Sequence, residues 1–283
     1  MLLLIGALIV VASVVGGFLM EHGNLSVLWQ PSEFIIIFGA ALGSFLIASP
    51  AKLLAEVVKN VQGSVGGKRK GKQRHIELLI LLYKLFHKVR KEGLVSIESD
   101  IEDPGQSRIF AAYGTAHANS NVLDFICDNL KVIITTNVPA HELETLMELE
   151  IETTQNEAMA PSRGLAKLAD ALPGLGIVAA VLGVVLTMGK IDQPPSVLGH
   201  SIGSALTGTF LGVLMSYGFV GPLATALEHT VESEEIDLQV IKVAIVAFVG
   251  GAAPQIAVEF GRRAIPGDDR PSFNELEKEI RGK

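Results

Sequence analysis

Four long apolar stretches divide the chain, and none of them contains a carboxylate, lysine, arginine or histidine side chain. They run roughly over Met1–Met20, Phe34–Ser49, Ala171–Met188 and Ile202–Ala226. A bilayer core requires about 20 apolar residues per helix, or about 17 when flanking residues reach outward. The pattern predicts transmembrane helices 1 and 2 within residues 1–49 and helices 3 and 4 within 171–227, with no titratable group in any span.

The polar segments are predicted to be helical as well. Leu78, Leu82, Leu85 and Val89 recur at helical spacing, which predicts a helix over His75–Lys91 that stops at Gly93. Further helices are expected at Val95–Ile101, Val122–Leu130 and Pro139–Asp170, and no strand pattern is evident. The predicted fold class is all-α: a polytopic membrane protein with a large helical insertion, residues 50–170, and a polar C-terminal segment, residues 228–283. The short apolar stretch Val243–Ala253 is predicted to be a buried or interfacial helix instead of a fifth span.

The distribution of basic residues predicts the orientation in the membrane. The link Glu21–Glu33 has no lysine or arginine, and the link after the third stretch has only Lys190. Lysine and arginine side chains instead follow the second and fourth stretches: Lys52, Lys59, Lys68, Arg69, Lys70, Lys72, Arg74, Lys242, Arg262 and Arg263. By the positive-inside rule, both long segments and both termini are cytoplasmic. The first stretch lacks a basic flank and a cleavage pattern, so a retained helix is expected instead of a signal peptide.

Composition agrees with this class of protein. The 283 residues are 49% hydrophobic and the mean hydropathy is +0.43, too apolar for an ordinary soluble domain. A net charge of −7 argues against nucleic acid as a partner. The single cysteine, Cys127, excludes an internal disulfide and is expected to be a small buried side chain.

No enzymatic motif survives inspection. Gly199–Gly203 matches G-x-S-x-G, but no span supplies a histidine base for the serine. Gly66–Lys72 resembles a phosphate-binding loop, except that Gln73 replaces the Ser or Thr that would bind magnesium. The histidines show no metal-ligand spacing, so neither a cofactor nor a metal is expected.

Prolines, small residues and one threonine stand out within the spans, most of them in the third and fourth. Pro173 and Pro222 are expected to kink the third and fourth spans at matching depth, where they would hinge or widen a pathway; proline is also simply more frequent in membrane helices. Close helix packing is expected at three pairs with small-xxx-small spacing: Gly39 and Gly43, Ala179 and Gly183, and Gly208 and Gly212. Thr209 either bonds to its own helix or faces a conduit.

Charged side chains surround the predicted helix break at Gly93. Arg90 precedes the break and Glu98 follows it. Cations favour a helix C-terminus and anions a helix N-terminus, and a solvated face explains most such runs. A recognition patch is the alternative.

Several segments together resemble the MotA family of bacterial flagellar stator subunits, within the MotA/TolQ/ExbB proton channels. These are Ala171-Leu-Pro-Gly-Leu-Gly-Ile-Val-Ala-Ala-Val-Leu-Gly-Val-Val185, Gly208-Thr-Phe-Leu-Gly212, Tyr217-Gly-Phe-Val-Gly-Pro-Leu-Ala224, Ala257-Val-Glu-Phe-Gly-Arg262 and Arg270-Pro-Ser-Phe-Asn-Glu-Leu-Glu277. The resemblance implies a pentamer in the bacterial inner membrane around two MotB chains, whose essential aspartate supplies the missing carboxylate. It also implies that ion flow turns the ring and that residues 50–170 push on the rotor protein FliG.

The family's functional residues map onto particular positions. The rotor-contact charges match Arg90 and Glu98, with Glu150 a weaker candidate, and the important prolines match Pro173 and Pro222. Sodium-using relatives tend to place a threonine on the third span beside the channel; this chain has Ala179 and Ala180 in that region, with Thr209 on the opposing span. Because alanine cannot ligate sodium, we expect protons.

Two alternatives remain open from the sequence. An ExbB- or TolQ-like subunit uses the same kind of ring for envelope work, although the four spans and the tail count against it. A passive scaffold that packs partners without conducting ions would use the small-residue faces equally well. An enzyme is not expected.

Overall fold

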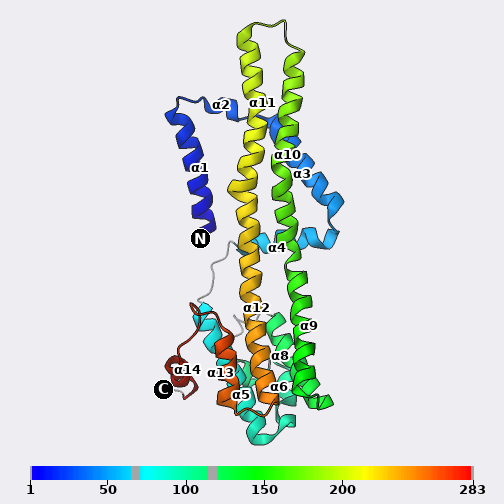
Figure 1. The fold of residues 1–283 in the computed structure, drawn as a ribbon, viewed down its shortest axis with the longest axis vertical. Helices are drawn as coiled ribbons and strands as arrows, with labels where there is room; N and C mark the ends of the chain where they lie inside the picture. Colours follow the sequence, from blue (N-terminus) through cyan, green and yellow to red (C-terminus); the bar gives the residue numbers. More distant parts are fainter. Residues whose placement is uncertain (1, 65–70, 112, 114–119, 282–283) are drawn as a thin grey trace. The chain divides into compact units, whose positions relative to one another are not determined.

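The computed structural model describes residues 2–64, 71–111, 113 and 120–281, and every regular element in those ranges is a helix (Figure 1). Most of the phosphate-loop-like motif Gly66–Lys72 lies outside the described residues, and so do the basic residues Lys68, Arg69 and Lys70. The helices are α1 (Leu2–Met20), α2 (Leu25–Leu28), α3 (Pro31–Ala48), α4 (Ala51–Ser64), α5 (Gly71–Glu92), the 3₁₀ helix η1 (Leu94–Ile97), α6 (Glu98–Glu102), α7 (Arg108–Ala111), α8 (Ser120–Thr136), α9 (Ala140–Ala158), α10 (Ala160–Met188), α11 (Pro195–Met215), the π-helix η2 (Ser216–Val220), α12 (Gly221–Val249), α13 (Pro254–Ala264) and α14 (Phe273–Ile280).

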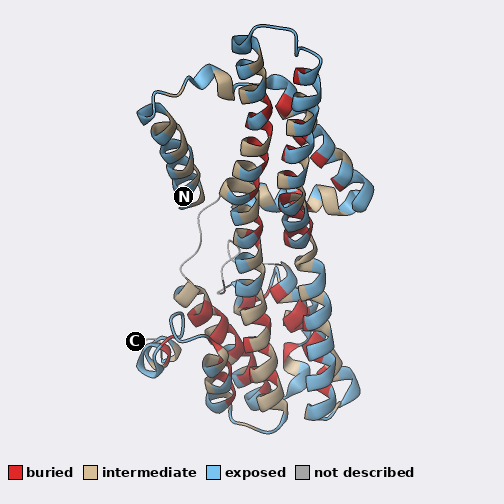
Figure 2. Cartoon of the chain, turned by 45° about the horizontal axis from the view of Figure 1, so that its top comes forward, coloured by how far each residue is buried: buried red, intermediate tan, exposed pale blue. Residues whose placement is uncertain are grey.

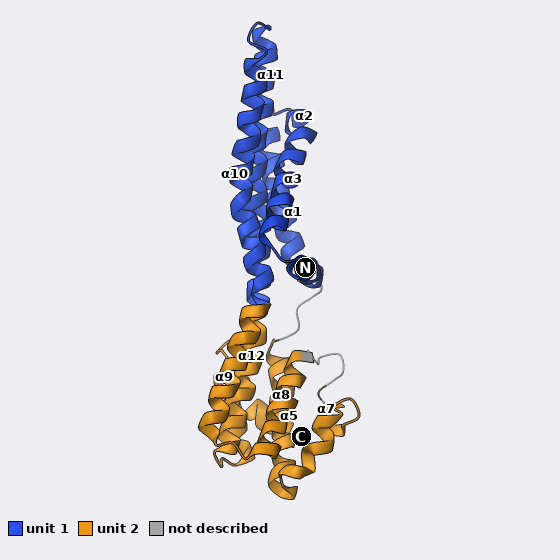
Figure 3. Ribbon diagram, turned by 90° about the vertical axis from the view of Figure 1, so that its right-hand side faces the viewer, with its two compact units in different colours: residues 1–67, 158–230 blue, residues 68–157, 231–283 orange. Residues whose placement is uncertain are grey.

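The chain forms two compact units, coloured separately in Figure 3. Unit 1 comprises residues 1–67 and 158–230, and unit 2 comprises residues 68–157 and 231–283. Four helical segments are long and apolar enough to cross a membrane: Leu2–Met20, Leu25–Ala48, Ala140–Met188 and Pro195–Val249. The apolar part of each corresponds to one predicted span, so the predicted all-α membrane fold is confirmed.

Unit 1 is built around the antiparallel pair α10 and α11, which α3 and α4 cover. Ile37 and Ala41 of α3 pack against Leu172 and Ala179 of α10, while Phe45 packs against Leu165 nearer the start of α10. The helix α1 buries none of its residues within this chain, and Figure 2 shows it as a mixture of exposed and half-buried residues. Apolar side chains that remain uncovered on a spanning helix are suited to lipid or to neighbouring helices.

Small residues bring the backbones of α10 and α11 together. A methyl group built on Gly212 would lie 2.5 Å from the carbonyl oxygen of Leu172, and one on Gly183 would lie 2.6 Å from the Cβ atom of Ala205. Two of the three predicted pairs therefore lie at a close helix contact, as small-xxx-small spacing requires. The third pair, Gly39 and Gly43, has nothing within 4 Å in the described part of the chain.

Unit 2 has its own hydrophobic core, formed by α5, α6, α8, α9, α12 and α13. Phe86 of α5 is fully buried and stacks on Phe248 of α12, with ring centroids 4.4 Å apart. Cys127 is buried as expected, and desolvation raises the pKa of its thiol to about 11. The apolar stretch Val243–Ala253 supplies the end of α12, where Ala244 and Ile245 are buried in this core. It is therefore a buried helix, as predicted.

Candidate functional site

Two of the predicted channel residues lie at the contact between α10 and α11. A methyl group built on Gly208 would lie 3.2 Å from the backbone nitrogen of Ala180, and one on Gly176 would lie 3.3 Å from the Cα atom of Thr209. Thr209 and Ala180 are both half-buried. The structure thus places the alanine on the third span and the threonine on the fourth at the same contact between the two helices.

The two prolines do not lie at matching depth, so that expectation is wrong. Leu172, which precedes Pro173, is level with Gly212. Pro222 lies ten positions beyond Gly212 in the same run of helix, which corresponds to about 15 Å along the axis at 1.5 Å per residue. The prolines therefore act on different levels of the α10–α11 pair.

Pro222 instead accompanies a local change in helix geometry. The five residues of η2 form a π-helix, in which the N–H of Gly221 donates to the carbonyl oxygen of Ser216. Pro222 has no N–H to continue an α-helical ladder, which favours such a bulge, and the hydroxyl of Thr225 donates to the carbonyl oxygen of Gly221 at 3.3 Å. Bulges of this kind occur frequently at functional positions.

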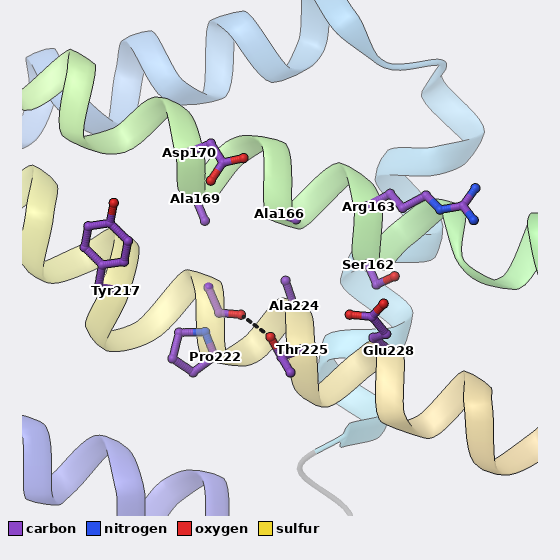
Figure 4. A pocket seen from close by; sticks show the side chains of 11 residues that line it. Ser162, Arg163, Ala166, Ala169, Asp170, Tyr217, Pro222, Ala224, Thr225 and Glu228 are labelled. Atoms are coloured by element: carbon purple, nitrogen blue, oxygen red, sulfur yellow. Dashed lines mark hydrogen bonds between the residues drawn. The ribbon is translucent and has the colours of Figure 1, made fainter.

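A pocket of about 370 Å³ lies beside this bulge, entirely within unit 1 (Figure 4). Asp170 of α10 and Tyr217 of η2 line it near one end, and Glu228 of α12 with Ser162 of α10 lines the other. Pro222 belongs to its lining and Pro173 does not. The pocket therefore places one predicted hinge residue beside a space whose lining includes two carboxylates, Asp170 and Glu228.

The second spanning helix carries a buried carboxylate that the apolar pattern missed. The stretch was expected to begin at Phe34, but α3 begins at Pro31 and includes Glu33 in its first turn. Glu33 is 6% exposed, and its Oε2 atom lies 2.7 Å from a methyl group built on Gly208. The expectation of spans without a titratable group is therefore wrong. Proline at the first position of a helix, followed by an acid in the first turn, is a start signal that would have placed Glu33 inside the helix.

The predicted rotor-contact charges lie in unit 2. Arg90 is exposed in the last turn of α5, and Glu98 is exposed as the first residue of α6. Neither forms an ion pair with another described residue, so both charges are available to a partner. Gly93 between them adopts a positive φ of 89°, which ends α5 and separates the two charges.

Glu150 has a different environment. Its Oε2 atom accepts a hydrogen bond of 3.0 Å from Nδ2 of Asn129, a buried residue of α8. Desolvation raises the pKa of the Glu150 carboxyl and Asp128 raises it further, while the Asn129 hydrogen bond opposes the shift. Its half-buried carboxylate is already bound within unit 2, unlike Arg90 and Glu98.

The fold and these sites define a class: a helical membrane subunit with close-packed inner spans and a separate charged unit. Comparisons with known proteins identify the family. The MotA N-terminal family model matches residues 4–93, and the MotA/TolQ/ExbB proton channel family model matches residues 117–240. The chain is 44% identical to motility protein A of Escherichia coli K12 over 281 residues, which cover 99% of this chain and 95% of the relative.

Another relative and two solved structures show the same similarity. Chemotaxis protein LafT of Vibrio parahaemolyticus is 37% identical over 97% of this chain and 96% of its own length. The solved structure of C. jejuni MotAB matches with a TM-score of 0.78 at 20% identity, covering 96% of this chain and 98% of that chain. The flagellar MotAB stator complex of Bacillus subtilis matches with a TM-score of 0.73 at 22% identity, covering 94% and 96%.

The chain therefore belongs to the motility protein A family of the MotA/TolQ/ExbB proton channels. The prediction of a flagellar stator subunit, a channel-forming motility protein and not an enzyme, is confirmed. Full-length identity to motility proteins distinguishes it from the ExbB and TolQ branch.

Proposed function

We propose that this chain assembles with a MotB-type partner in the bacterial inner membrane and conducts protons through the α10–α11 spans to generate torque. The observation that carries this proposal is the α10–α11 contact itself. Its backbones approach too closely for larger side chains at Gly176, Gly208 and Gly212, and Ala180 and Thr209 border it. Residues 171–188 of α10 and the whole of α11 carry no carboxylate, so a partner must supply one between these spans, and MotB supplies an aspartate by family resemblance.

Protons are the proposed ion. Alanine at position 180 offers no side-chain oxygen to replace the hydration shell of sodium, whereas a proton needs only a carboxylate and water. Each elementary charge crossing the membrane releases about 2.3 kcal/mol per 100 mV. That energy drives the proposed rotation of the ring.

Torque is proposed to reach the rotor protein FliG through Arg90 and Glu98. Both side chains are exposed and unpaired among the described residues, and they carry opposite charges on either side of the break at Gly93. Weak surface pairs steer rapid association and are suited to a contact that forms and breaks repeatedly. The hydrogen bond to Asn129 makes Glu150 a less direct contact.

The assembly and orientation belong to the same proposal. Five copies are proposed to surround two MotB chains, with both termini and residues 50–170 and 228–283 in the cytoplasm. The exposed apolar side chains of α1 and α10 support burial against lipid and neighbouring copies, and the basic residues that follow the second span support the orientation.

The test is ion flux in vesicles that contain this chain and a MotB partner without its plug. Acidification at the same rate in low and high sodium is expected. Flux that requires sodium would contradict proton use, and an assembled complex without flux would favour the passive scaffold.

A further inference from the structure

Glu33 is the only carboxylate in the described spanning segments, namely α1, α3, residues 171–188 of α10, and α11. It is 6% exposed, and it lies where α3 packs on α10 and α11. Carboxylates are rare in spanning helices because their transfer from water is costly, and those that occur commonly serve ion or proton pathways. The position of Glu33 therefore requires an explanation.

The start of α3 does not by itself explain why Glu33 is buried. An acid in the first turn of a helix interacts favourably with the helix dipole, which accounts for a glutamate near the start of α3. However, the side chain of Gln30 does not cap α3, and the Oε2 atom of Glu33 is buried without a hydrogen-bond partner among the described residues. That oxygen points instead toward Gly208, where even a methyl group would not fit.

No countercharge faces Glu33 from the elements around it. The helix α2 and residues 171–188 of α10 carry no titratable side chain. On α11 the nearest is the exposed His200, eight positions before Gly208 and thus about 12 Å away along the helix. A buried carboxylate without a countercharge is stable only when it is neutral or holds a cation.

Hydrogen bonds join the link that precedes α3 to α11 close to this carboxylate. The Nε2 atom of Gln30 donates to the Oγ atom of Ser204 at 2.9 Å and to the carbonyl oxygen of Val27 at 3.1 Å. The hydroxyl of Thr207 donates to the same carbonyl oxygen at 3.3 Å. Thr207 directly precedes Gly208, so these hydrogen bonds lie one residue from the position that the Glu33 carboxylate faces.

The same space borders the contact between the inner spans. The built methyl group on Gly208 that meets Glu33 also lies 3.0 Å from the Cβ atom of Ala179 and 3.2 Å from the backbone nitrogen of Ala180. A cation held by Glu33 would therefore lie beside the proposed conducting pair.

We propose that Glu33 is a proton-binding site on the conduction route, which takes up the ion from the outer link and passes it to the partner's aspartate. This inference rests on the proposed function. In each passage the carboxylate forms one O–H bond and later breaks it as water accepts the proton, so the chain returns to its starting state.

The test compares proton flux through plug-free complexes that contain the parent chain, Glu33→Gln, Glu33→Asp or Glu21→Gln. Glutamine keeps the size of the side chain but binds no proton, while Glu21→Gln removes an exposed carboxylate from the preceding link. We expect Glu33→Gln to lower flux about tenfold and to flatten its dependence on outer pH. The Glu33→Asp and Glu21→Gln complexes should retain most of the flux and its pH dependence.

Different results overturn different statements. A parent complex that does not conduct contradicts the proposed function and this inference with it. A conducting parent and a Glu33→Gln complex with the same rate and pH profile contradict the role of Glu33 alone.

A second measurement needs no substitution. Dicyclohexylcarbodiimide is an apolar reagent that adds to protonated carboxylic acids in membranes. Peptide mass spectrometry of the parent complex should detect adducts on Glu33 that decrease as pH rises from 6 to 9, in parallel with loss of flux. Adducts absent from Glu33, or independent of pH, would overturn the proposal even if Glu33→Gln failed to assemble.

Discussion

The contact at Gly212 leads to a quantitative prediction, because alanine there has no space. Its Cβ atom would lie 2.5 Å from the carbonyl oxygen of Leu172 and 2.9 Å from the Cα atom of Gly176, and both are backbone atoms. No side chain can rotate away, so α10 and α11 must separate by about 1 Å in this close-packed interface. Overpacking of this kind costs about 1–3 kcal/mol, partly offset by about 1 kcal/mol from the better helix propensity of alanine.

The matched control is Gly39→Ala on α3, where nothing lies within 4 Å of the added methyl group. That variant should be unchanged or more stable by up to about 1 kcal/mol, because it gains propensity without a clash. Thermal unfolding of the complex in detergent and proton flux in vesicles would be measured for both variants. Gly212→Ala should lower both the midpoint and the flux, and equal behaviour of the two variants would refute the close-contact argument.

Three further predictions concern unit 2. Glu98→Lys should abolish motility while the complex still assembles and conducts, as scored by swimming, membrane content and flux; normal swimming would count against an electrostatic rotor contact. Glu259→Gln should destabilise the protein by about 2 kcal/mol at pH 7, because Glu259 accepts charge-assisted hydrogen bonds from Arg262 and its pKa is lowered to about 2, chiefly by that bond. Because the pKa of Glu259 is lowered in the folded protein, its stabilising contribution is complete above the ordinary carboxyl range and is lost as pH falls toward 2. The free energy of unfolding in urea should therefore fall more steeply between about pH 5 and 2 for the parent than for the variant. The same pH dependence in both proteins would contradict this. Phe86→Ala should cost about 3–5 kcal/mol through the cavity left beside Phe248, and an unchanged unfolding midpoint would show that the stack contributes little.

The sequence predicted the helical elements well where one strong physical signal decides the outcome. Length and hydropathy located the four spans, and the leucine spacing located α5 within a few residues of its ends, Gly71 and Glu92. The burial of Cys127 followed from its surroundings in the same way. These features depend on local composition, which an apolar or amphipathic pattern records directly.

The hydropathy pattern did not predict features that depend on three-dimensional packing. Arg74 was counted as one of the basic residues flanking the membrane, yet it pairs with the fully buried Asp237 from a distant part of the chain. The level of Pro222 relative to Pro173 depends on the register of α10 against α11, which no single helix specifies. Glu33 was missed because a hydropathy boundary at Phe34 excluded a polar residue that the helix start includes.

The candidate sites likewise include features that the sequence could predict and features that required the folded structure. Arg90 and Glu98, which were chosen by family resemblance, are exposed as a rotor contact requires. The hydrogen bond from Asn129 to Glu150 joins residues of two helices, so only the folded structure could show it. The π-helix before Pro222 also required coordinates, since proline alone is compatible with a kink, a bulge or a helix start.

The central claim is that ion flow through this chain becomes rotation. The direct measurement is the rotation of tethered cells that lack their own stator subunits and express this chain with a MotB partner, while the proton gradient is varied at constant sodium. Rotation speed should rise with the proton gradient and should not depend on the sodium concentration. Rotation should stop when the partner's membrane aspartate is replaced by asparagine. Rotation that persists with the asparagine partner, or cells that conduct protons without turning, would contradict the account.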